Sequence, residues 1–347
     1  MVLVVHTMTM RIFLIRQAIM LLIICSAGLM TSMPVCSQAP QLLRGPAFSD
    51  PEYQEDMPEE WRTQAIVRDK APADTDIAVT LDQHLYPALL PLIQEYAKNH
   101  HLKIAVHEGT CGISARLLAD KKADIGGFCC PAANSDRLPG LVFHTMGIAS
   151  LAVIVHPDNP VTNIETKTVR GLFQGAYGYW GEVAEFGTGK QKDTMIRPVG
   201  RLHCKLRPGH WRLILDNEDL FSPRLNEVST IPDMFNQVAK EQGAIGYEVL
   251  WMAHVNADAG KVKRVKIDNH HPQDSEALVK GEYPFYRTYN ITTWSEKPAN
   301  NPKADALVDY LLQNVDKLDA RYGIIPAQQL RAAGWKFKGD ELIGEPD

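Results

Sequence analysis

Residues 76–128 read DIAVTLDQHLYPALLPLIQEYAKNHHLKIAVHEGTCGISARLLADKKADIGGF, and this stretch decides the fold class. Three short runs rich in apolar residues alternate with two segments in which apolar residues recur at helical spacing. Because strand–helix alternation brings successive strands into one parallel sheet with helices on its faces, we expect an α/β fold. The predicted strands are 76–80, 102–107 and 123–128, and the predicted helices are 86–99 and 112–119.

The same alternation continues towards the C-terminus. An apolar run at 151–155 ends in the double-proline turn HPDNP (156–160), which is typical of a hinge that leaves a first lobe. The β-rich segment 283–294 (YPFYRTYNITTW) is expected to carry the chain back to that lobe. The remaining predicted elements are helices at 165–174, 208–216, 232–241, 304–315 and 327–333, strands at 195–201 and 244–249, and an edge strand at 261–267.

The composition is that of an ordinary globular protein. Of the 347 residues, 45% are hydrophobic and 22% are charged, and the net charge is −5 with no basic block. A chain with this charge pattern lacks the electrostatic footprint of a nucleic-acid-binding protein, so nucleic acid is excluded as a partner.

The N-terminus has the pattern of a secretory signal. Arg11 and Arg16 precede an apolar core at 18–30, which is shorter than the roughly 20 residues that a membrane-spanning helix needs. We therefore predict a signal peptide at 1–37 and export to the periplasm. A lipid anchor on Cys36 is the disfavoured alternative, because Met-Pro-Val is a poor lipobox. Residues 38–74, rich in Pro and acids, are expected to form a leader or linker outside the core.

Four stretches in this order resemble the phosphate-binding branch of the periplasmic solute-binding proteins of ABC transporters. They are HEGTCGISARLLADKKADIGGFCCPA (107–132), LAVIVHPDNPVTNIETKTVRGLFQGAYGYW (151–180), GAIGYEVL (243–250) and YPFYRTYNITT (283–293). The resemblance covers roughly 75–335 and implies a two-lobed type 2 periplasmic-binding-protein fold, its lobes joined by two crossover strands. The expected parts are lobe 1 at 75–153 and 283–335, lobe 2 at 154–282, and a tail at 336–347.

The resemblance also implies a function. Such a protein captures a small oxyanion by lobe closure and delivers it to the membrane subunit of an ABC transporter, without catalysing a reaction. The ligand would lie where strands end and helices begin, since backbone N–H groups there favour anions. In this chain the loops are 80–87, 108–114, 128–132 and 201–210.

The residues in these loops depart from the family pattern. Only Arg201 carries over cleanly, as a bidentate anion donor, while Cys129 and Cys130 replace a Ser-Asp pair. The predicted ligand-binding residues are His84, Thr110, Cys111, Ser114, Cys129, Cys130, Arg201, His203, Cys204 and Arg207.

Three alternatives follow from the cysteines. Cys111 could pair with Cys129 or Cys130 in a structural disulfide, as an oxidising compartment favours. No cofactor is expected, but thiols and imidazoles could instead hold a soft metal ion or metalloid. A redox or catalytic role on the same fold is the third, although no nucleophile elbow or zinc-protease helix is present. The candidate metal ligands are His84, Cys111, Cys129, Cys130, His203, Cys204 and His210.

Overall fold

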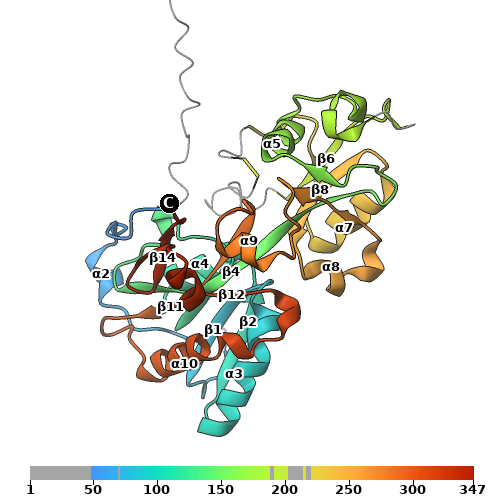
Figure 1. Ribbon diagram of the computed structural model, residues 1–347. Helices are drawn as coiled ribbons and strands as arrows, with labels where there is room; N and C mark the ends of the chain where they lie inside the picture. The colour runs from blue at the N-terminus through green and yellow to red at the C-terminus, as the bar shows by residue number, and fades with distance from the viewer. Residues whose placement is uncertain (1–47, 69–70, 188–190, 202–213, 216–219) are drawn as a thin grey trace, which may run out of the picture. The chain divides into compact units, whose positions relative to one another are not determined.

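The stretch 76–128 folds into the predicted alternation of strands and helices (Figure 1). All six residues of β1 are buried, and this strand pairs in parallel with β2 on one side and β3 on the other. The elements are β1 (Ile77–Asp82), α3 (Tyr86–His100), β2 (Ile104–Gly109), α4 (Cys111–Ala119) and β3 (Ile125–Phe128). The computed structural model describes residues 48–347 apart from 69–70, 188–190, 202–213 and 216–219.

One long strand joins the two parts of the sheet. β4 (Leu141–Val155) pairs antiparallel with β11 (Tyr286–Trp294) over 141–150 and with β8 (Ala244–Val249) over 151–155. The order of neighbours along the main path is β2-β1-β3-β11-β4-β8-β6-β7. β6 is Arg197–Gly200 and β7 is Asn226–Glu227, and both continue the sheet in parallel with β8.

Helices cover the sheet and bury its apolar residues. α3 packs beside α10 (Pro302–Gln313), where the Tyr96 and Tyr310 rings lie 4.9 Å apart. α7 (Ile231–Lys240) packs on β8, and the reciprocal Thr230–Asp233 capping box satisfies backbone donors at its start. The other described elements of three or more residues include α5 (Thr166–Gln174), α8 (Met252–Val255), α9 (Ser275–Val279), α11 (Ala327–Ala332), β13 (Lys336–Lys338) and β14 (Glu341–Gly344).

The described part of the expected leader packs against the body. Helix α2 (Glu59–Arg62) places Trp61 in the core with 9% of its surface exposed, and its Nε1 donates to the carbonyl of Ala119 at 2.6 Å. Further along, Arg68 forms a two-pronged ion pair with the buried Asp124 at 2.5 and 2.7 Å. The expectation that 38–74 lies outside the core therefore differs from the structure, because Trp61 anchors the segment.

Lys121 lies under this segment and is almost fully buried. Its backbone has a positive φ of 53°, and its Nζ lies 3.9 Å and 3.7 Å from the ring centroids of Trp61 and Trp294. Burial lowers the pKa of Lys121 to about 8. The two indole faces attract the protonated amine, which partly offsets the cost of burying it.

Several predictions fall outside the described residues or differ in detail. The signal peptide at 1–37 and most of the helix expected at 208–216 lie outside them. The edge strand expected at 261–267 is present as two short strands, β9 (Lys263–Arg264) and β10 (Lys266–Ile267). Within the described part of the chain, no helix is both long and apolar enough to cross a membrane. The lobe boundaries stay a prediction.

Candidate functional site

The loops that follow β1, β2 and β3 meet at one edge of the sheet. Thr80 and Ser114 bring their hydroxyl oxygens to 3.3 Å, and the sulfurs of Cys111 and Cys129 also lie 3.3 Å apart. All four side chains are buried. The sequence-based expectation that these three loops converge is met, because the carboxyl ends of parallel strands share one edge.

The start of helix α4 is fixed by Thr110. Its hydroxyl accepts the backbone N–H of Ile113 at 3.3 Å, an ordinary N-cap, and Cys111 is the first residue of the helix. Thr110 thus caps the helix, and its predicted contact with a ligand stays a prediction. Ser114 lies one turn later on the same helix and faces β1.

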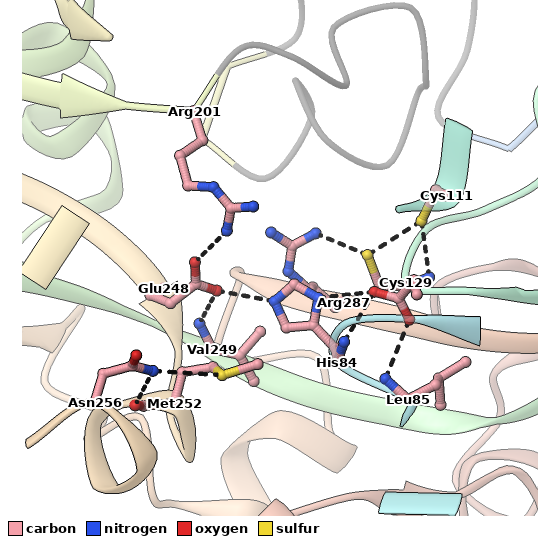
Figure 2. Close-up of polar contacts among 11 residues, drawn as sticks. His84, Leu85, Cys111, Cys129, Arg201, Glu248, Val249, Met252, Asn256 and Arg287 are labelled. Carbon is pink, nitrogen blue, oxygen red and sulfur yellow. Dashed lines mark hydrogen bonds and ion pairs between the residues drawn. The ribbon is translucent and has the colours of Figure 1, made fainter. Parts of the chain in front are cut away.

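His84 lies between two buried carboxylates. Its Nδ1 is 2.9 Å from Oδ2 of Asp82, and its Nε2 is 3.1 Å from Oε1 of Glu248 (Figure 2). Asp82 also accepts the backbone N–H groups of His84 and Leu85 at 3.1 Å, which holds the turn that leads into α3. Both ring nitrogens of His84 are thus engaged, and neither is open to a metal in this arrangement.

Glu248 connects His84 to Arg201. Nη1 of Arg201, which follows β6, donates to Oε2 of Glu248 at 2.9 Å, and all three side chains are almost fully buried. Burial alone would raise the pKa of Glu248, but the hydrogen bond and charge of His84 and the charges of Arg201 and Arg287 hold it well below its usual range. Glu248 is therefore an anion in the folded protein.

Arg287, on strand β11, is a second buried guanidinium beside this network (Figure 2). Its Nη1 donates to the sulfur of Cys129 at 3.4 Å, whereas its Nε has no hydrogen-bond partner among the described residues. Burial would lower the pKa of Arg287, yet Cys129 and Glu248 raise it, so the side chain stays charged. An unpaired buried donor of this kind costs free energy unless a ligand or water satisfies it.

The cysteine thiols are held in their protonated form. The pKa of Cys129 is raised by its contacts with Cys111 and Cys130 and by burial. For Cys111 the contact with Cys129 lowers the pKa, but Cys130 and burial outweigh it and raise the pKa well above the usual value. No disulfide joins Cys111, Cys129 or Cys130. The donor atoms of Asp82, Cys111 and Cys129 all lie within 4.8 Å of one another.

The structure thus gathers part of the predicted site and adds three residues to it. His84, Cys111, Ser114, Cys129 and Arg201 lie in or beside the network, as does the buried Cys130. Asp82, Glu248 and Arg287 were not predicted as site residues. Glu248 and Arg287 could have been, because each is a charged residue within a segment, 244–249 or 283–294, that is otherwise uncharged. The predicted residues His203, Cys204, Arg207 and His210 lie outside the described residues.

Comparison with known proteins agrees with this architecture. A family model described as a PBP superfamily domain matches residues 67–315, while a search of curated proteins finds no match. An ABC-type phosphate transport receptor from Vibrio cholerae has a TM-score of 0.57 at 20% identity, covering 72% of this chain and 99% of its own.

A second solved structure supports the same fold. A protein from Clostridium perfringens, assigned as a phosphate ABC transporter substrate-binding protein and holding phosphate, has a TM-score of 0.61 at 15% identity. It covers 72% of this chain and 99% of its own. The predicted fold class and the resemblance to solute-binding receptors are confirmed at the level of family and fold. This chain, with its two-lobed α/β architecture, belongs to the PBP superfamily.

Proposed function

We propose that the protein is an exported receptor that binds a small oxyanion between Arg201 and Arg287 and delivers it to an ABC transporter in the membrane. The observation that carries the proposal is this pair of buried guanidiniums. One follows β6 and the other lies on β11, so they come from the two different parts of the sheet that β4 joins. Guanidinium groups bind oxyanions through charge-assisted, often two-pronged hydrogen bonds.

The surrounding groups support binding of an anion. Nε of Arg287 is a buried donor with no partner among the described residues, and the nearby start of α4 adds the positive end of a helix dipole. The carboxylate of Glu248 lies beside Arg201 and balances part of the positive charge of the two guanidiniums before an anion binds. The phosphate held by the related Clostridium perfringens protein is a small oxyanion.

A receptor suits these side chains better than an enzyme does. A cysteine nucleophile needs a lowered thiol pKa and a base within reach. Here burial and neighbouring thiols raise the pKa of Cys111 and Cys129, and the nitrogens of His84 face carboxylates instead of sulfur. We therefore propose binding without catalysis.

Calorimetric titration of the purified protein with phosphate, sulfate, arsenate and molybdate tests the proposal. We expect at least one anion to bind, and Arg287→Gln to weaken its binding about ten- to hundredfold, since a hydrogen bond to a charged group contributes about 1.5–3 kcal/mol. Arg287→Lys keeps the charge and should bind better than the Gln variant.

The matched control is Arg116→Gln, because the Arg116 side chain is 82% exposed on α4. This variant should bind like the wild type. Absence of binding by all four anions, or equal affinity in the wild type and a folded Arg287→Gln variant, would overturn the proposal. Circular dichroism establishes that each variant is folded.

A further inference from the structure

The thiols of Cys111 and Cys129 form a buried pair that oxyanion binding does not use. Cys111 opens α4 and Cys129 follows β3, with 2% and 6% of their surfaces exposed. Their sulfurs lie 3.3 Å apart without a bond, and the backbone N–H of Cys129 points at the sulfur of Cys111 at 3.2 Å. The backbone thus holds two thiols side by side at the edge where the loops converge.

The sulfur separation discriminates between kinds of soft ligand. With bonds of about 2.3 Å, a tetrahedral zinc ion holds its sulfur ligands about 3.8 Å apart. The same bond length and the observed 3.3 Å correspond to a sulfur–centre–sulfur angle of about 90°. A trivalent metalloid has three bonds and a lone pair, and the lone pair compresses its bond angles well below the tetrahedral value. The pair therefore fits a pyramidal centre better than a tetrahedral one.

The charged groups around Cys111 and Cys129 also favour a neutral metalloid over a metal cation. The guanidinium of Arg287 lies 3.4 Å from the sulfur of Cys129 and would repel a cation. The oxygens of Asp82 already accept hydrogen bonds from His84 and Leu85. A neutral trivalent hydroxide meets none of these obstacles.

We infer that Cys111 and Cys129 form a chelating site for a trivalent metalloid hydroxide, of which arsenous acid is the simplest example. The inference adds a second ligand class to the protein and does not depend on the oxyanion proposal.

The binding step balances without a redox partner. Two sulfur–arsenic bonds form and two arsenic–oxygen bonds break. Each thiol proton leaves with one hydroxide as water, so arsenic stays trivalent and one hydroxyl remains on it. Arg287 supplies a hydrogen-bond donor next to the new bonds, because its Nη1 already contacts the sulfur of Cys129.

Native mass spectrometry of the reduced protein with sodium arsenite tests the inference. We expect one bound arsenic, with the mass loss of two waters, in the wild type. Because each thiol is one arm of a chelate, Cys111→Ser and Cys129→Ser should each weaken binding about a hundredfold. Arg116→Gln changes an exposed side chain on the same helix α4, so it is the control and should retain the adduct.

Three results would overturn the inference. One is an adduct that persists in both Cys111→Ser and Cys129→Ser, and another is zinc chloride binding in place of arsenite. The third is a Cys111–Cys129 disulfide that stays closed in reductant. Phosphate titration of the same variants is a separate readout, so a failed oxyanion site and a failed thiol site can be told apart.

Discussion

At the scale of single residues, the loops of the site were predicted from the sequence, but most of the charged residues inside it were not. Cys111 and Cys129 were predicted to be close because each follows a strand of the same parallel sheet. They follow β2 and β3, the two strands that flank β1, and their sulfurs lie 3.3 Å apart. Glu248 and Arg287 were overlooked because each occupies an alternating position in a segment that fits an ordinary strand. A single sequence does not show which distant charge neutralises a buried one. The pairing of Glu248 with Arg201 and His84 could therefore be identified only from the folded structure.

Glu248→Gln should destabilise the protein by about 3–5 kcal/mol, because it removes the buried carboxylate that pairs with Arg201 and His84. The pKa of Glu248 is held well below its usual value of 4.5 in the folded state. Its contribution is therefore complete above about pH 5 and is lost as the pH falls below that value. Urea unfolding at pH 7 and at pH 4 should show the difference between wild type and variant shrinking at the lower pH.

The control for this change is Glu276→Gln. Glu276 forms a surface pair with Lys280, and its side chain is 78% exposed, so its loss should cost less than about 1 kcal/mol. A difference between wild type and Glu248→Gln that is equally small at both pH values would contradict the ion-pair network.

At the scale of elements, periodicity located most strands and helices but shortened β4. The sequence predicted only 151–155, whereas the strand begins at Leu141. His144, Thr145 and Gly147 interrupt the apolar run, and their places in the sheet come from pairing with β11 and β12 (Ile325–Pro326). Gly147 is required there, since a Cβ would lie 2.0 Å from the carbonyl oxygen of Ile325. Pairing over such sequence distances cannot be derived from local patterns.

Trp61→Ala should destabilise the protein by about 3 kcal/mol or more, because it empties a buried aromatic site and removes the indole that covers Lys121. Val67→Ala is the matched control in the same segment, since Val67 is 60% exposed and should cost little. Chemical denaturation measures both. Equal stability of the two variants would show that the segment 48–68 contributes little to the folded state.

At the scale of the whole molecule, four weak motifs in the right order were sufficient to predict the family. Each motif describes a different strand, helix or turn, so the four in this order are far more specific than any one of them alone. The ligand could not be predicted in the same way, because its identity depends on which buried donors and acceptors remain unpaired after folding. Nε of Arg287 is such a donor among the described residues, and nothing in the local sequence indicates it.

Binding of an oxyanion to the folded state alone should stabilise the protein as a whole. At a phosphate concentration about a hundred times the dissociation constant, the free energy of unfolding should rise by about 2.7 kcal/mol. Thermal unfolding at increasing phosphate measures this shift. Arg287→Gln, at the same concentrations, should show a much smaller shift. An equal shift in the two proteins would place the anion elsewhere.

Strand β4 has a consequence for how the protein opens. Its amides bond to β11 along one stretch and to β8 along the next, so the two parts of the sheet share one continuous backbone. If β4 separated from β11 or from β8, the half of the strand that stayed paired would lose the support of the other half. Backbone amides near Ser150 and Leu151 should therefore exchange with deuterium only through complete unfolding, and their exchange rates should report the stability of the entire protein.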